Sequence, residues 1–402
     1  MTHPDSGRPT VITGAAVLMA DGRVQPGSVV IDGSSIAEVT TRPVRGRGAN
    51  VIDAEGRLVV PGLVDLHLHG AGGASWESVV DPGTDAARES AVPRVLRHLA
   101  RAGVTATFAS VASDAVETMA GRARALTGWR DHPLPDGAEL LGTHLEGPFL
   151  ASAQGGAHDP ALLVEPAPDA VARLVETRPA MITLAPELPG GIDAVRAFAA
   201  AGTIVAIGHS EAGPAEVSAA VEAGASHLTH LWSGQSTTTR SGPWRMPGLL
   251  EASLSSTGLT AEVIADGKHL PPELLEIARR CLGESLIAVS DATEGAGMPD
   301  GFTYGLATVR CEVRNGVGMV IGQPAFGGST TTLDGMLAHL CLELGWPVPE
   351  ALQMLSARPA MIAGVGDRKG RLAAGYDADV LVLDEHLRPW RTWVRGTPAL
   401  QP

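Results

Sequence analysis

Short apolar segments of β type alternate with helical segments through the middle of the chain. Eight such segments are separated by stretches in which apolar residues recur at helical spacing. The eight segments cover residues 63–67, 104–110, 139–145, 181–185, 203–208, 225–231, 259–265 and 286–290. This alternation predicts an α/β fold, a (β/α)8 TIM-like barrel, with a doubly wound parallel sheet as the competing arrangement.

Both ends of the chain have a different pattern. Residues 10–60 consist of short apolar runs broken by Gly and Asp, which is typical of small antiparallel strands joined by tight turns, and the pattern returns after Lys369. We therefore expect residues 1–61 and 369–402 to form one small β-sandwich domain, with the barrel, residues 62–368, inserted between its two parts. A further hairpin is expected at residues 302–322, after the eighth segment.

The charge balance argues against some classes of partner. The 402 residues include 44 acidic and 30 basic side chains, a formal net charge of −14, so neither nucleic acid nor an anionic membrane is an expected partner. The polar N-terminus lacks the apolar core of a signal peptide, and no run reaches the ~18 apolar residues of a membrane span. The three cysteines form no CxxC pair. We expect a soluble, cytoplasmic protein.

Polar residues that can bind metals follow the apolar segments at their carboxyl ends. In a barrel these ends meet on one face, where the active sites of this fold lie. Any one such histidine could be an ordinary core or surface residue, but imidazoles and carboxylates together predict a site for Zn²⁺ or a similar divalent ion. The residues are His67, His69, Glu146, His209, His230 and Asp291. Histidines without such a placement, and expected to be bystanders, are His3, His98, His132, His339 and His386.

A series of motifs carries a resemblance that covers nearly the whole chain. In chain order they are PGLVDLHLHGAGG (61–73), HLEGPFL (144–150), GAHDP (156–160), LAPE (184–187), AIGHS (206–210), AGASHLTHL (223–231), ADGKH (265–269), VSDA (289–292) and KGRLAAGYDADVLVLD (369–384). Together they resemble the N-acetylglucosamine-6-phosphate deacetylase family of the amidohydrolase superfamily. HLEGP followed by GAH is the most specific part of the match.

The resemblance implies a metal-dependent hydrolase with one or two divalent ions. Zn is expected first, with Fe, Mn or Co as alternatives. Glu146 would be the shared ligand, with His209 and His230 on one metal and His67 and His69 on the other.

The resemblance also assigns roles around the ions. Asp291 would serve as a ligand and as the catalytic group, which accepts a proton from water and passes it to the departing amine. His158 and His269 would contact the substrate.

Lysine usage narrows the chemistry within the superfamily. The chain has only Lys268 and Lys369, so no early strand can supply the carboxylated lysine with which dihydroorotase-like members bridge two metals. Ala212 occupies the place, three residues after His209, where deaminases of the superfamily carry a catalytic Glu. We therefore expect Glu146 to bridge the metals and expect deacetylation rather than deamination.

The loop after His230 departs from the family pattern. Family members read LFNAM and then HREPG, whereas this chain reads LWSGQSTTTRSGPWRMPG over residues 231–248. Ser233 and Gly234 replace the family's Asn and Ala, and Arg245, with Arg240 as a rival, stands where the phosphate-binding Arg of the family is expected. In the family that Arg comes from a neighbouring subunit, which implies a homodimer.

The expected substrate is a small-molecule amino sugar, with N-acetylglucosamine 6-phosphate first and Ser233, Gly234 and Arg245 among its contacts. Because the loop diverges, two alternative substrates stay open: an unphosphorylated or different N-acetylamino sugar, and an N-acyl amino acid. A barrel that serves only as a scaffold is the non-enzyme alternative.

Overall fold

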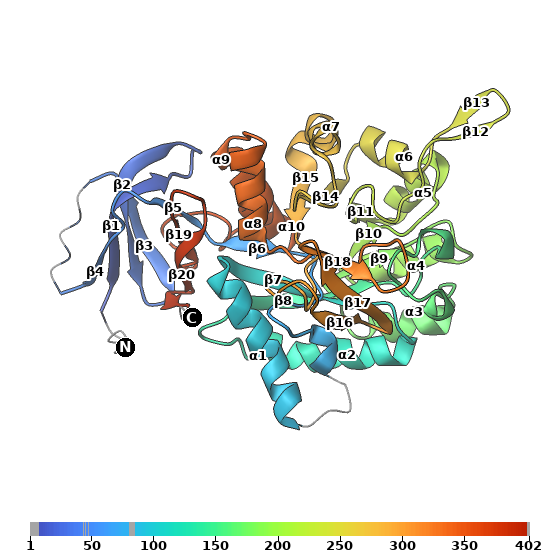
Figure 1. Ribbon diagram of the computed structural model, residues 1–402, viewed down its shortest axis with the longest axis horizontal. Helices are drawn as coiled ribbons and strands as arrows, with labels where there is room; N and C mark the ends of the chain where they lie inside the picture. Colours follow the sequence, from blue (N-terminus) through green and yellow to red (C-terminus); the bar gives the residue numbers. More distant parts are fainter. Residues whose placement is uncertain (1–7, 43, 45, 47, 80–84, 400–402) are drawn as a thin grey trace.

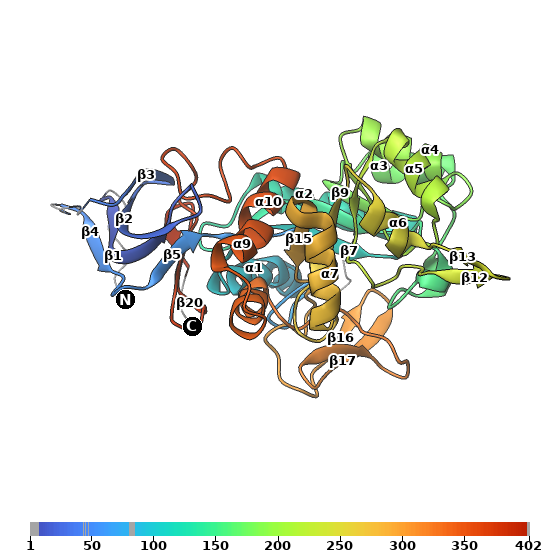
Figure 2. The ribbon, with the colours of Figure 1, turned by 90° about the horizontal axis from the view of Figure 1, so that it is seen from above.

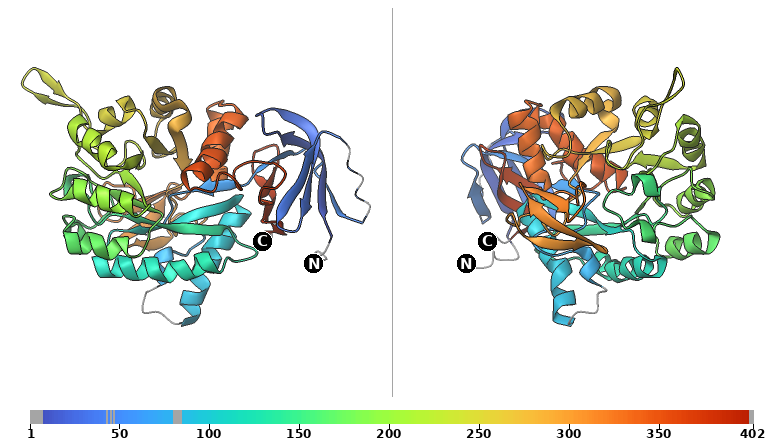
Figure 3. Two further views of the ribbon diagram at one scale, coloured as in Figure 1. Left: turned by 180° about the vertical axis from the view of Figure 1, so that it is seen from behind. Right: turned by 45° about the vertical axis from the view of Figure 1, so that its right-hand side comes forward.

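The computed structural model describes residues 8–42, 44, 46, 48–79 and 85–399, with side chains except those of 85–90. Figures 1 and 3 show an α/β body and, at one end of it, a smaller β unit that contains strands from both ends of the chain.

A parallel sheet of eight strands forms the centre of the large unit. Each strand pairs with the next one along the chain, without the reversal of order that defines a doubly wound sheet, so that alternative is wrong. The eight predicted segments are confirmed as β6 (Leu63–Asp65), β7 (Val104–Ala112), β8 (Glu139–Glu146), β9 (Met181–Leu184), β10 (Ile204–Ile207), β11 (Ala225–Leu228), β14 (Thr260–Ile264) and β15 (Leu286–Val289). β6 and β15 stand at the two ends of this order.

Helices connect the successive strands and cover the outside of the sheet (Figure 1). They are α1 (Asp85–Arg101), α2 (Val116–Asp131), α3 (Pro168–Val175), α4 (Gly191–Ala200), α5 (Pro214–Ala223), α6 (Leu249–Ser255) and α7 (Pro272–Leu282). α7 illustrates why they pack: Leu275, Ala278 and Leu282 recur at helical spacing and are buried, while Arg279 and Arg280 lie in its last turn, near the negative end of the helix dipole.

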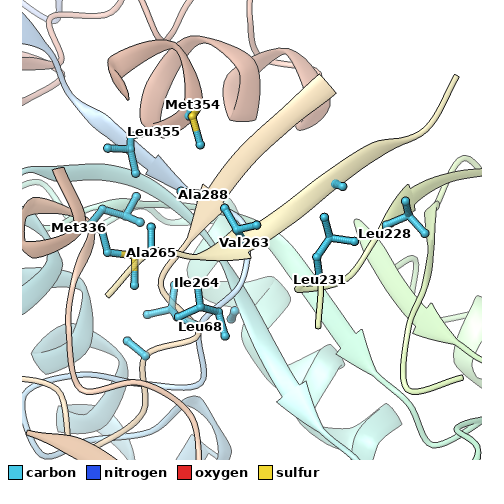
Figure 4. Close-up of a cluster of buried hydrophobic side chains, with 14 of the residues drawn as sticks. Leu68, Leu228, Leu231, Val263, Ile264, Ala265, Ala288, Met336, Met354 and Leu355 are labelled. Carbon is cyan, nitrogen blue, oxygen red and sulfur yellow. The ribbon is translucent and has the colours of Figure 1, made fainter. Parts of the chain in front are cut away.

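The main hydrophobic core lies between the strands and their helices. All nine residues of β7 are buried, as expected for a strand covered on both faces. Figure 4 shows another part of this core, where Met354 and Leu355 of the C-terminal helical segment lie over Ala288 of β15. That segment contains α8 (Leu333–Ala338), α9 (Val348–Leu352) and α10 (Arg358–Ile362).

The two chain ends share one sheet. Its strands are β1 (Thr10–Leu18), β2 (Val24–Asp32), β3 (Ser35–Thr40), β4 (Asn50–Asp53), β5 (Leu58–Pro61), β19 (Val380–Leu383), β20 (Pro389–Val394) and β21 (Thr397–Pro398). β19 pairs antiparallel with β5, which joins residues about 320 positions apart, Val380 opposite Pro61.

The strands of the small domain belong to one hydrogen-bonded sheet, which branches at β1. The first half of β1 pairs with β4 and its second half with β5. An irregularity between Ile12 and Ala15 separates the two halves. Such a bulge bends a strand, which allows it to change partners without a second sheet.

Two small antiparallel units extend from the large unit (Figure 2). The hairpin expected at 302–322 is a three-stranded sheet of β16 (Thr303–Leu306), β17 (Val309–Arg314) and β18 (Val317–Val320). The other is a hairpin of β12 (Thr239–Ser241) and β13 (Trp244–Met246), which projects beyond α6. Within the described part of the chain, no helix combines the length and apolar character that crossing a membrane requires.

Candidate metal centre

The predicted metal-binding residues meet at the carboxyl ends of the parallel strands. Glu146 is the last residue of β8, and the others lie up to four residues beyond the ends of their strands. All are buried or nearly so. Two of them have left-handed backbone, His209 with φ of 49° and Asp291 with φ of 47°, so the chain turns sharply just after β10 and β15. Positive φ is uncommon outside glycine and is often found where a site constrains the chain.

Glu146 is the centre of the cluster. Its Oε1 lies 3.0 Å from His230 Nε2, 3.2 Å from His209 Nε2 and 3.4 Å from His67 Nε2. Its Oε2 lies 3.2 Å from His69 Nε2 and 3.4 Å from His158 Nε2. One carboxylate therefore faces five imidazoles.

Asp291 adds a second carboxylate beside the first-strand histidines. Its Oδ1 lies 3.5 Å from His69 Nε2 and 3.7 Å from His67 Nε2. His67 Nε2 is buried without a hydrogen-bond partner. Three overlapping groups of donor atoms are close enough to share an ion: His67–Glu146–His230, His67–His69–Asp291 and Glu146–His158–His209.

The opposite ring nitrogens fit this arrangement. His209 Nδ1 lies 2.7 Å from the carbonyl oxygen of Gln154, and His230 Nδ1 lies 3.2 Å from that of Ser233. Metal-binding histidines commonly have their second nitrogen engaged in this way, which orients the first toward the ion. The residues present therefore fit a divalent metal.

The electrostatics of the cluster favour ionised carboxylates. Burial alone would raise the pKa of Glu146, but the charges of His67 and His158 and hydrogen bonds from His158 and His209 outweigh it, so this pKa is held well below its usual range. The pKa of Asp291 is also lowered: burial opposes ionisation, but its histidine neighbours, His69 first, outweigh burial.

The pKa values of the histidines shift in different directions. Burial lowers the pKa of His209 to about 4, so its ring is neutral near pH 7. Burial also disfavours the charged form of His69, but hydrogen bonds to Asp291 and Glu146 outweigh it and raise its pKa to about 9. A metal ion must displace such a proton to bind, so metal binding at this cluster releases protons.

His158 is more buried than we expect of a loop residue that only contacts substrate. Besides its approach to Glu146, its Nδ1 accepts the backbone N–H of Ser113 at 3.3 Å. It belongs to one of the three donor groups. The structure therefore places it among the candidate ligands as well as on the pocket wall.

A cavity of about 430 Å³ opens over the cluster. Its lining includes Ser233, Gly234 and His269, all predicted substrate contacts. His269 is oriented by Asp266, whose Oδ2 lies 2.8 Å from its Nδ1, and its ring packs 4.5 Å from that of Phe326. An apolar wall completes the lining with Leu270, Leu274, Leu306, Ala325 and Phe326.

Arg245 does not reach the cavity of its own chain. It lies on β13, opposite Arg240 on β12, and donates to the carbonyl oxygen of Pro243 at 3.0 Å. The hairpin is exposed, with Trp244 72% accessible. Among the described residues that line the cavity there is no Lys or Arg.

The bystander histidines stay away from the cluster where the structure describes them. His132 approaches the carbonyl oxygen of Gly128, and His339 lies beside Glu343. His98 and His386 belong to none of the donor groups, and His3 lies outside the described residues.

Three buried polar residues beside the site were missed by the sequence analysis: Glu262, His227 and His144. Glu262, in β14, lies 3.0 Å from His67 Nδ1 and 3.0 Å from His227 Nε2. His144 lies between Ser110 and Thr183, at 2.9 and 2.8 Å. A carboxylate inside the apolar run AEVIA is the signal that could have identified Glu262, because an unpaired buried Glu is rare.

The amino-acid sequence of this chain matches a family of known proteins. The family model for the amidohydrolase family matches residues 58–401. The chain therefore belongs to the amidohydrolase family.

The similar proteins within that family are deacetylases of amino sugar phosphates. The chain is 33% identical to an N-acetylglucosamine-6-phosphate deacetylase from Vibrio furnissii, over 84% of this chain and 82% of the relative, and 32% identical to one from Danio rerio, over 86% and 85%. An N-acetylgalactosamine-6-phosphate deacetylase from Escherichia coli O157:H7 is 28% identical over 99% of this chain and 100% of the relative. The predicted resemblance is thus confirmed.

A solved structure matches the fold over almost its full length. A mutant N-acetyl-D-glucosamine-6-phosphate deacetylase from Mycobacterium smegmatis, in complex with N-acetyl-D-glucosamine-6-phosphate, has a TM-score of 0.87 at 28% identity. The match covers 98% of this chain and 100% of that one.

Proposed function

We propose that this protein hydrolyses the acetamide of N-acetylglucosamine 6-phosphate to glucosamine 6-phosphate and acetate. The observation that carries the proposal is the cluster of five imidazoles around Glu146, with Asp291 beside it, on the floor of a sugar-sized cavity. The names and the substrate complex of its relatives supply the substrate.

The proposed ligands are His67, His69, Glu146, His209 and His230, with Asp291 and His158 beside them. When bound, a divalent ion, zinc first, acidifies water and polarises the amide carbonyl. Glu146 lies in two of the three donor groups, which supports one or two ions.

Asp291 is the proposed acid–base residue. Its carboxylate faces the cavity and is ionised near pH 7, so it can accept a proton from the attacking water at an Oδ. The same proton then goes to the amide nitrogen, because an amine leaves only when it is protonated. His269, oriented by Asp266, would bind the sugar on the cavity wall.

We further propose that the phosphate is bound by a second copy of the chain in a homodimer. The cavity lining described above lacks a cationic Lys or Arg, and the projecting hairpin carries Arg240 and Arg245 in register. Trp244 and Met246, 72% and 48% exposed, would be covered by such a contact. A guanidinium suits bidentate phosphate binding.

Closure of the parallel sheet into a barrel is also proposed. The N–H of Asp291 donates to the carbonyl oxygen of His67 at 2.8 Å, and that of His69 to Ala292 at 2.6 Å. Leu68 and Ala292 form an isolated parallel bridge. The segments that follow β6 and β15 are therefore neighbours.

We propose domain boundaries near residues 61 and 369, supported by the pairing of β5 with β19. A cytoplasmic location is proposed as well, supported by the free thiols of Cys281, Cys311 and Cys341.

A substrate panel tests the reaction. Zinc-loaded protein is expected to release acetate fastest from N-acetylglucosamine 6-phosphate, and slower from N-acetylgalactosamine 6-phosphate and free N-acetylglucosamine. Cleavage confined to N-acyl amino acids would contradict the sugar assignment. Absence of bound metal, together with no turnover on the panel, would favour a scaffold.

A further inference from the structure

Glu262 is a fully buried carboxylate in the middle of β14. Burying a charge is costly unless it is paired and hydrogen-bonded, so its neighbours are informative. Its Oε2 lies 3.0 Å from Nδ1 of His67 and accepts the backbone N–H of His230 at 3.2 Å. Its Oε1 lies 3.0 Å from Nε2 of His227. Glu262 thus connects two candidate metal ligands, from different strands, to a third histidine outside the cluster.

The connection continues away from the cluster. His227 is also fully buried, and its Nδ1 lies 2.6 Å from the Oγ1 of Thr260. Thr260 in turn lies 3.2 Å from the carbonyl oxygen of Ser226. The ring of His227 is therefore held at both nitrogens, and it presents Nε2 to Glu262.

This arrangement determines which nitrogen of His67 can bind a metal. An ionised carboxylate only accepts hydrogen bonds, so the proton of a neutral His67 must sit on Nδ1, toward Glu262. The lone pair of Nε2 then points to the side where Glu146 and Asp291 lie, and this is the nitrogen that has no hydrogen-bond partner. Carboxylates in this position orient metal-binding histidines.

We propose that Glu262 is a positioning residue, which holds His67 in the tautomer and orientation that metal binding requires, and that His227 holds Glu262 in place. The inference rests on the proposed metal centre.

The positioning role of Glu262 is tested by the equilibrium affinity for zinc, measured by competition with a chromophoric chelator. Gln at position 262 keeps the shape but has one acceptor oxygen, so it can accept from His67 or from His227 but not from both. Glu262→Gln is expected to weaken zinc binding on the order of 10–100-fold. The matched control is Glu139→Gln, the same exchange at the first residue of β8, away from the cluster. Its zinc affinity is expected to stay within about twofold of the original, because Glu139 contacts none of the cluster.

Two further readouts separate positioning from a general structural role. Thermal unfolding should show a smaller zinc-induced rise for Glu262→Gln than for the original chain, whereas Glu139→Gln should destabilise the metal-free protein and keep the full rise. In ¹⁵N-histidine NMR of the zinc-loaded protein, the Nδ1 proton of His67 should be strongly hydrogen-bonded, and its signal should shift in Glu262→Gln.

Each outcome has a defined meaning. Unchanged zinc affinity in a folded Glu262→Gln variant would overturn the inference. If that variant does not fold, His227→Gln replaces it, with a loss of several-fold expected, and unchanged affinity there would overturn the inference equally. If the original chain itself binds no zinc, the proposed metal centre fails instead.

Discussion

At the scale of single residues, the carboxylates of Glu146 and Asp291 differ in geometry and therefore in proposed role. Glu146 lies within 3.4 Å of five imidazole nitrogens, whereas Asp291 approaches two, from farther away, and faces the cavity. The first geometry suits a shared metal ligand, and the second suits a group that exchanges protons with substrate and water.

Removal of the central charge should therefore empty the site. Glu146→Gln leaves the imidazoles without a shared anion, and we expect zinc affinity to fall by more than the roughly 10–100-fold typical of residues that only support a ligand. Metal content after dialysis, measured by atomic emission, checks this. Retention of the original zinc content would contradict the shared-ligand assignment.

Asp291→Asn should separate binding from catalysis. Asn keeps the shape and tolerates the left-handed backbone at this position, where φ is 47°. It cannot accept the proton, so turnover is expected to fall by roughly 10²–10⁴-fold while metal content stays near normal. Near-normal turnover in the variant would rule out the proposed role.

At the scale of elements, the strands could be predicted more fully than their contacts. A strand is marked by a run of apolar β-type residues that are adjacent in the sequence, so all eight parallel strands could be predicted. The third strand of the 303–320 unit and the branching of the terminal sheet were missed, because both depend on pairing partners that local patterns do not identify.

The β12–β13 hairpin gives the prediction at this scale. If a second copy supplies the phosphate contact, Arg245→Ala should raise KM for the phosphorylated sugar by roughly 10–100-fold, the value of a lost charged hydrogen bond. Turnover of free N-acetylglucosamine should be unchanged. Arg240→Ala is the matched variant, since Arg240 lies directly opposite on the same hairpin.

The kinetics of the two hairpin variants identify the phosphate contact. A larger effect of Arg240→Ala would transfer the role to that residue. Equal effects on phosphorylated and free sugars, or none on either, would refute a phosphate contact from the hairpin.

At the scale of the whole molecule, a buried ion-pair network joins the two units. Lys369 Nζ lies 2.8 Å from Glu139, the first residue of β8, and 2.7 Å from Asp379, just before β19. Arg368 adds a contact of 2.7 Å to Glu139. The network thus links the amino end of a parallel strand to the terminal sheet.

This network should make stability depend on acid. Burial alone would raise the pKa of Glu139, but the hydrogen bond from Arg368 and the charge of Lys369 lower it from 4.5 to about 2. A lowered pKa stabilises the folded state above about pH 4.5, and this contribution is lost as the pH falls toward 2. The shift corresponds to about 3 kcal/mol at most.

Urea unfolding of Glu139→Gln beside the original chain measures this contribution. The difference in the free energy of unfolding is expected to be largest near pH 6 to 7, and to shrink below about pH 4.5. A difference that stays constant down to pH 3 would show that Glu139 does not contribute through its charge.

The amino-acid sequence alone specifies the alternation of strands and helices and the metal-binding residue types at the strand ends, because both are properties of neighbouring residues. The folded chain is needed to show which of these residues face one another. His67 and Glu262 are 195 positions apart and lie near opposite ends of the strand order. They meet because the segments that follow β6 and β15 pair with each other, which brings β14, the neighbour of β15, close to β6. For the same reason His158 lies beside Glu146 and Arg245 lies away from its own cavity, since contacts between distant segments depend on how the strands pair and where the loops between them lead.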